Sequence, residues 1–126
     1  MQNRAARFGP AAMATAVANL LNCALTSNSG PVGISSPALA NIALYLIITH
    51  IRLVNTAASA ATASLFIGTT ATSATAAAFA FNGYSIAANS YVDWYGRVRL
   101  DVADYLTGLA SATTVTWQAE GEIGLN

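Results

Sequence analysis

The sequence predicts an all-β protein, an antiparallel β-sandwich of jelly-roll-like form with an extended N-terminal arm. Apolar and polar residues alternate strictly over residues 91–102, and the same alternation returns over residues 114–123. Short β-branched runs separated by Asn and Gly turn signals occupy much of the remaining chain. Six to eight short strands without a long helix are typical of a sandwich. We assign residues 1–30 to the arm and first strand, and residues 31–126 to the β-sandwich domain.

The first 30 residues admit two interpretations. Apolar residues recur at helical spacing between Met13 and Ala24, and Pro10 suits a first helical turn. Alternate residues between Met13 and Leu25 would equally share one face of a strand. We favour the extended arm followed by a strand.

The middle of the chain predicts further strands. The run "LYLIITHIRLVN" is rich in β-branched residues and predicts a strand largely buried on both sides. Its two faces would be Ile47, Thr49, Ile51 and Leu53, and Ile48, His50, Arg52 and Val54. A turn over residues 55–60 leads to a strand that ends at Gly68. Residues 69–78 read as a loop or weak strand, and "FAFNGYSI" as a strand broken by the turn signal Asn82-Gly83.

The two alternating segments are the clearest strands. In residues 91–102 the even positions are apolar and the odd positions polar, and Gly96 is the natural place for a bulge. Residues 101–113 read as turns. In the C-terminal segment Val115, Trp117, Ala119 and Ile123 share one face and the glutamates share the other. If both segments lie in one sheet, we expect Glu120 and Glu122 to meet Arg97 and Arg99 across strands.

The composition indicates a protein that associates. The 126 residues fit one domain, but only 8% are charged, no lysine occurs and the formal net charge is zero. Five arginines in three places form no basic stripe, which argues against a nucleic-acid partner. The apolar run at 38–48 is shorter than the roughly 20 residues that cross a membrane, so no membrane partner is expected. Asn19 and Asn22 interrupt the run that imitates an export signal.

The sequence predicts no catalytic residue, no metal site and no cofactor, and hence a protein that is not an enzyme. A single cysteine, Cys23, excludes an intramolecular disulfide and a Cys-based zinc site, and we expect it to be a small buried side chain. The single histidine, His50, is expected to be packed or hydrogen-bonded. The carboxylates of Asp101 and Asp104, and those of the two glutamates, are expected to be solvated or paired with arginine.

The segment "YVDWYGR" predicts an interface. Trp, Tyr and Arg are enriched where protein surfaces meet. The outward residues of this segment and the arginines of the arm therefore form our candidate interface. A sugar-binding surface uses similar aromatic residues and stays open as an alternative. The candidate interface residues are Tyr91, Tyr95, Arg97, Arg99, Arg4 and Arg7.

The chain also resembles small β-sandwich virion proteins of tailed bacteriophages, of the capsid decoration or cement type. The likeness covers about residues 45–124 and rests on the pattern of strands and turns: Ile51-Arg52 and Val54-Asn55, then Ile67-Gly68, then Leu100, Asp104 and Leu106, then Gly121-Glu122.

The resemblance implies a structural protein of the virion that binds the phage head lattice at the capsid surface and stabilises it. Its partners would be the major capsid protein and neighbouring copies of itself, with a homotrimer as the expected oligomer. The alternatives are a minor tail or head-fibre protein and a carbohydrate-binding adhesin module on the same sandwich.

Overall fold

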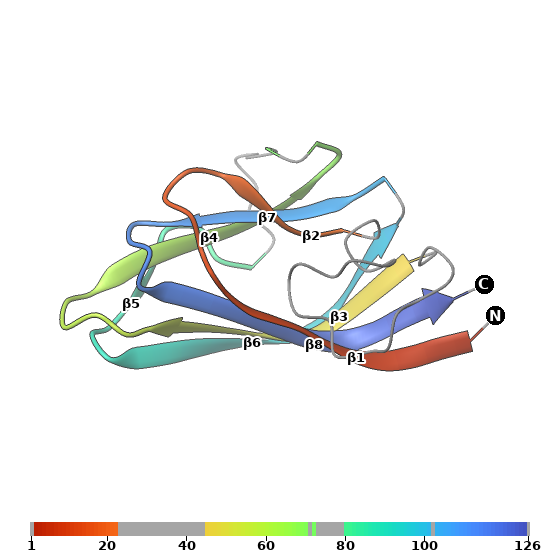
Figure 1. The fold of residues 1–126 in the computed structure, drawn as a ribbon, viewed down its shortest axis with the longest axis horizontal. Coiled ribbons are helices and arrows are strands. Elements are labelled where there is room, and N and C mark those ends of the chain that lie inside the picture. Colours follow the sequence, from red (N-terminus) through yellow and green to blue (C-terminus); the bar gives the residue numbers. More distant parts are fainter. Residues whose placement is uncertain (1, 23–44, 71, 73–79, 102, 126) are drawn as a thin grey trace.

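The computed structural model describes residues 2–22, 45–70, 72, 80–101 and 103–125, and confirms the all-β sandwich. These residues contain eight strands, which form two antiparallel four-stranded sheets that face each other as two layers (Figure 1). Sheet A has the order β1-β8-β3-β6 and sheet B the order β2-β7-β4-β5. The strands are β1 (Gln2–Ala12), β2 (Ala18–Asn22), β3 (Tyr45–Asn55), β4 (Ala61–Gly68), β5 (Tyr84–Ile86), β6 (Ser90–Asp101), β7 (Tyr105–Ala110) and β8 (Val115–Leu125).

The strand pairing has the jelly-roll pattern. The first strand pairs with the eighth, the second with the seventh, the third with the sixth and the fourth with the fifth. Each half of the chain therefore contributes two strands to each sheet, as in a sandwich of two interlocked Greek keys. The register of β1 against β8 brings the two ends of the chain together at one end of the sandwich (Figure 1).

The N-terminal segment is extended and not helical. Strand β1 is an edge strand of sheet A, while β2 lies in sheet B, so the first 22 residues supply one strand to each layer. Phe8 of β1 and Leu21 of β2 are both fully buried, so each strand contributes to the core. The register of β1 shifts between Phe8 and Ala11, at Gly9-Pro10, where Gly9 has a φ of +78°.

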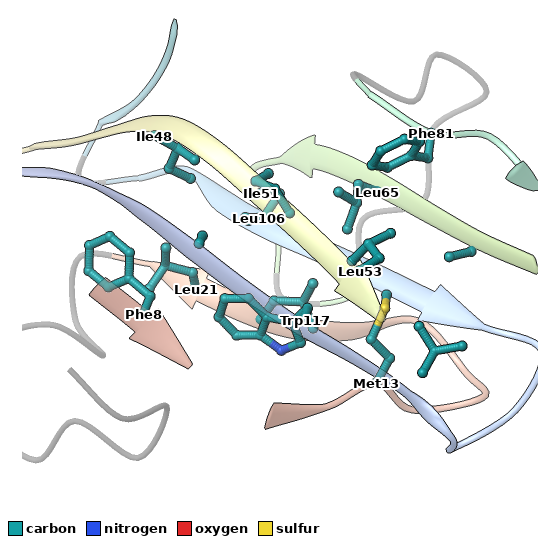
Figure 2. Close-up of a cluster of buried hydrophobic side chains, with 14 of the residues drawn as sticks. Phe8, Met13, Leu21, Ile48, Ile51, Leu53, Leu65, Phe81, Leu106 and Trp117 are labelled. Carbon is teal, nitrogen blue, oxygen red and sulfur yellow. The ribbon is translucent and has the colours of Figure 1, made fainter. Parts of the chain in front are cut away.

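The core lies between the two sheets. Trp117 in β8 and Leu53 in β3 point from sheet A toward Leu65 in β4 and Leu106 in β7 of sheet B (Figure 2). The predicted inward face of the C-terminal strand is confirmed. Its members are all buried: Val115, Trp117, Ala119 and Ile123.

The predicted faces of the central strand β3 are wrong in one half. Leu46 and Ile48 face the core together with Ile51 and Leu53. The alternation changes phase because the registers of β3 against both β6 and β8 shift between Ile48 and His50, leaving Thr49 as a bulge against β8. The bulge turns His50 and Arg52 to the outer face of sheet A.

Two other expectations differ from the structure or fall outside it. Residues 105–110, expected as turn, form β7, because Leu106 and Ala110 alternate toward the core between β2 and β4. The predicted bulge at Gly96 is confirmed, since Gly96 and Arg97 together lie opposite Thr49. Cys23 and most of residues 69–78 lie outside the described residues.

The predicted turns after β3 and before β5 are confirmed. Asn55 is fully buried and its Nδ2 donates to the carbonyls of Ser59, Ile86 and Ala87, which holds the loop against the end of β5. Gly83 adopts a φ of +63°, as the Asn-Gly signal requires. The described part of the chain contains no helix that is long and apolar enough to cross a membrane.

Candidate functional site

The outer face of sheet A carries most of the charged side chains. Residues directly opposite each other in neighbouring strands share a face, and the register places the charged residues of β8, β3 and β6 in adjoining positions there. This face is consequently the polar surface of an otherwise charge-poor molecule. Its charged residues are Arg7, Arg52, Asp93, Arg97, Arg99, Asp101, Glu120 and Glu122.

At the centre of this face the Asp93 carboxylate receives three hydrogen bonds. Arg52 donates from Nε to Oδ1 at 2.7 Å and from Nη2 to Oδ2 at 3.0 Å, the two-point geometry that only a guanidinium provides. His50 Nε2 lies 2.9 Å from Oδ1. The side chain of Asp93 is only 16% exposed, so these bonds replace water that the carboxylate has largely lost.

His50 joins three strands. Its Nδ1 lies 3.0 Å from Oε1 of Glu120 in β8, while its Nε2 contacts Asp93 in β6. An ionised carboxylate only accepts hydrogen bonds, so the doubly protonated imidazolium is the form that satisfies both contacts at once. The prediction of a hydrogen-bonded histidine is confirmed.

The electrostatics of the cluster favour the ionised carboxylate. The hydrogen bonds from Arg52, and secondarily the one from His50, hold the pKa of Asp93 below its usual value against the opposing effect of burial. The same pairing raises the pKa of Arg52. Asp93 is therefore a negative charge that is held in place by Arg52 and contacts His50.

Aromatic rings cover this network. Tyr95 stacks on His50 with ring centroids 4.5 Å apart and an interplanar angle of 10°. The guanidinium of Arg52 lies 4.3 Å from the centre of the Tyr91 ring, at cation–π distance. Both tyrosines stay accessible, with 57% of Tyr91 and 70% of Tyr95 exposed. One side of each ring is thus held by the protein while much of the rest faces solvent.

A second, smaller cluster lies at the other end of β6. Arg99 donates from Nε to Asp101 Oδ1 at 2.7 Å, and its guanidinium lies 4.4 Å from the centre of the Tyr45 ring. The bond to Asp101 raises the pKa of Arg99. Tyr45 in turn lies over Gly124, where an added Cβ would meet its ring at 2.3 Å. The glycine makes room for the ring on which the arginine stacks.

The six predicted interface residues divide between two edges of sheet A. Tyr91, Tyr95, Arg97 and Arg99 follow one another along the outer face of β6. The arginines of the arm lie on β1, across β8 and β3, roughly 14 Å away at ordinary strand spacing. Arg7 is exposed opposite Glu120, and Arg4 pairs in register with Ile123.

The predicted contacts between the glutamates of β8 and the arginines of β6 are wrong. Both strands lie in sheet A, but β3 separates them. Glu120 contacts His50 instead, and Arg99 pairs with Asp101 within its own strand. The pair Asp101 and Asp104 belongs to a turn: Asp104 Oδ2 accepts a hydrogen bond from the backbone N–H of Asp101.

Sequence reasoning missed the members that organise this surface. Arg52 and Asp93 were not among the predicted site residues, and neither was Tyr45. The signal in the sequence was Asp93, which lies between Tyr91 and Tyr95 on the predicted outer face. A carboxylate at such a position indicates a cationic side chain on the neighbouring strand. The pairing of Arg52 with Asp93 could not be read from the sequence, because the register shift at Thr49 brings these two residues opposite each other.

The arrangement is suited to holding side chains in place. Both nitrogens of His50 are used in contacts with carboxylates, so neither is presented to a nucleophile. Within the described ranges no group of three or more His, Cys, Asp or Glu side chains is placed to hold a metal ion. Comparison with protein-family models, with curated proteins and with solved structures finds no match for this chain.

Proposed function

We propose that this chain is a non-enzymatic structural protein of a tailed-phage virion, which binds the outer head lattice as a decoration or cement protein. The observation that carries the proposal is the row of tyrosines and arginines along β6, whose geometry is fixed by neighbouring side chains. Tyr91 lies against Arg52, Tyr95 against His50, and Arg99 against Asp101 and Tyr45. Binding through such a row loses little side-chain entropy, because the rings and guanidinium are already oriented.

Composition and fold agree with this role. In a chain with 8% charged residues, no lysine and zero net charge, electrostatic repulsion does little to oppose association with other chains. The jelly roll is used by viral capsid proteins as well as by lectins, which supports the proposal by fold analogy alone. The expected partners are the major capsid protein and neighbouring copies of this chain.

The test is binding to purified phage heads that lack this protein. The chain should cosediment with the heads, appear at regular lattice positions by cryo-electron microscopy, and raise the temperature at which the heads rupture. Replacing Tyr91 and Tyr95 together by serine should abolish cosedimentation. Tyr84→Ser is the matched control, since Tyr84 is 49% exposed but lies on β5 in sheet B. Heads that never retain the chain would refute the proposal.

A carbohydrate-binding module is the second candidate. The ring of Tyr95 is flat against His50, largely exposed, and next to the Arg52–Asp93 pair, so an aromatic surface adjoins hydrogen-bonding groups. Aromatic rings beside polar side chains also suit sugar rings. Glycan-array binding that disappears on Tyr95→Ala, with no binding to heads, would favour this function over the first.

A further inference from the structure

The turn before β5 joins an exposed asparagine to a glycine. Asn82-Gly83 is the one Asn-Gly pair in the sequence, and both residues are exposed. Gly83 has a φ of +63°, and a Cβ added to it would meet nothing within 4 Å. The Asn82 side chain makes no hydrogen bond within the described ranges, so its amide can rotate toward the backbone nitrogen of Gly83. An accessible asparagine followed by an unhindered backbone nitrogen favours spontaneous deamidation, since asparagine is among the thermolabile residues.

Two hydrogen bonds hold this turn against β4. The N–H of Gly83 donates to Oγ of Ser64 at 2.7 Å, and the N–H of Leu65 donates to the carbonyl of Phe81 at 3.0 Å. Ser64 is only 7% exposed, and Phe81 is packed in the core beside Leu65 (Figure 2). The residues on both sides of Asn82 are therefore fixed, and the nitrogen that follows it is held by a buried hydroxyl.

We propose that Asn82 is a site of spontaneous deamidation and that the hydroxyl of Ser64 sets its rate. The backbone nitrogen of Gly83 forms a bond to Cγ of Asn82 and loses its proton to solvent. The Cγ–Nδ2 bond then breaks and releases ammonia. Water opens the resulting cyclic imide at either carbonyl, which leaves aspartate or isoaspartate at position 82, so water is the only other reactant. Because the N–H of Gly83 must leave Ser64 Oγ before its nitrogen attacks, the hydrogen bond slows the first step.

Deamidation would change both the charge and the main chain at this end of sheet B. None of the strands β2, β4, β5 and β7 contains a charged residue, so the new carboxylate would add a charge beside strands that have none. Isoaspartate also adds a methylene to the main chain between Phe81 and Gly83, so the bonds to Leu65 and Ser64 no longer fit their present positions together. The inference is independent of the proposed function, because it concerns only this turn and water.

Peptide mass spectrometry of the full chain, digested after incubation at mildly alkaline pH, measures the reaction. Asn82 should be converted to the acid, while the exposed Asn89, which precedes Ser90, should remain an amide over the same period. Ser64→Ala should convert Asn82 about three- to tenfold faster than the wild type, because one neutral hydrogen bond no longer opposes the attack. The wild type in urea should react at least as fast as Ser64→Ala, since unfolding removes the same bond.

Two further measurements separate the chemistry from the folding of the turn. Gly83→Ala is the chemical control: its Cβ hinders the attacking nitrogen but contacts no other part of the protein, so Asn82 should remain an amide. Slow hydrogen exchange of the Leu65 N–H should persist in Ser64→Ala, and its loss would show that the whole turn detaches and would contradict a role specific to Ser64. Equal rates in the wild type and Ser64→Ala would also overturn that role. An Asn82 that stays an amide even in urea would overturn the site itself.

Discussion

Gly121 is the position where the smallest substitution should have the largest effect on stability. It lies in β8 opposite Ile48, next to the bulge at Thr49. A Cβ added there would lie 1.8 Å from the carbonyl oxygen of Ile47 and 3.0 Å from Cα of Ile48. All of these neighbours are backbone atoms, so no side-chain rotation relieves the contact. In Gly121→Ala the backbones of β3 and β8 must separate by more than about 1 Å to reach ordinary contact distances.

The magnitude follows from the hydrogen bonds that such a separation breaks. Losing roughly two ladder bonds at about 1 kcal/mol each, and leaving a buried backbone group without a partner at about 1–3 kcal/mol, gives about 3–5 kcal/mol. A domain of this size is stabilised by about 5–15 kcal/mol, so the variant should retain the fold only marginally. The loss is concentrated in sheet A, because β8 lies between β1 and β3.

Urea unfolding followed by tryptophan fluorescence measures this loss, since Trp117 is 2% exposed in the folded state. The midpoint should fall strongly without a change in slope. Gly83→Ala is the matched control: its Cβ meets nothing within 4 Å, and only the φ of +63° is unfavourable, at about 1–2 kcal/mol. If Gly121→Ala unfolds at a midpoint similar to that of Gly83→Ala, the close approach of β3 and β8 at this point is wrong.

Substitutions at three further positions test the polar contacts. Asn55→Ala removes the amide that donates to three backbone carbonyls and should destabilise the fold by about 2–4 kcal/mol in urea unfolding. Asn55→Asp should be destabilised as well, because an ionised carboxylate cannot donate these hydrogen bonds. Asp93→Asn should lower the urea midpoint at pH 7. The stability that the Asp93 carboxylate supplies is present above the ordinary carboxyl pKa of 3.8 and is lost as the pH falls through the lower pKa of Asp93 in the folded state. The midpoints of the variant and the wild type should therefore converge over this pH range. A constant difference at all pH values would contradict the assigned charge. Arg52→Lys keeps the positive charge but should still lower the urea midpoint at pH 7. Lysine cannot make both hydrogen bonds to Asp93 and also lie flat over the Tyr91 ring. A midpoint equal to that of the wild type would show that the charge alone is sufficient.

The strands that alternate without interruption were predictable from the sequence. Trp117 and its inward neighbours in β8 are buried as the alternation indicates, because one face of a strand in a sandwich must meet the other sheet. Strand β7 was missed since it is short and contains Thr107 and Gly108, which suggest a turn. Both residues are buried between neighbouring strands, so tertiary pairing decides their conformation.

The site was less predictable than the fold because it depends on one bulge. The apolar positions of β3 that face the core are spaced by two except between Ile48 and Ile51, where the spacing is three; they are Leu46, Ile48, Ile51 and Leu53. That longer spacing is a usable signal, since an uninterrupted strand keeps a spacing of two. Without the bulge, a strand that buries Ile48 would also direct His50 to the core, and the ring would have no carboxylate on either side.

The bulge also explains how so few charges organise a whole face of the protein. By placing His50 and Arg52 on the outer side of the central strand, it lets each of them reach a carboxylate on an adjoining strand. Exposed ion pairs contribute little stability individually, and what this cluster chiefly supplies is register and ring orientation. A one-residue slip of β6 would separate Asp93 from Arg52 and His50 and turn Tyr91 and Tyr95 inward. The same residues that fix the strand therefore also hold the two tyrosine rings in place.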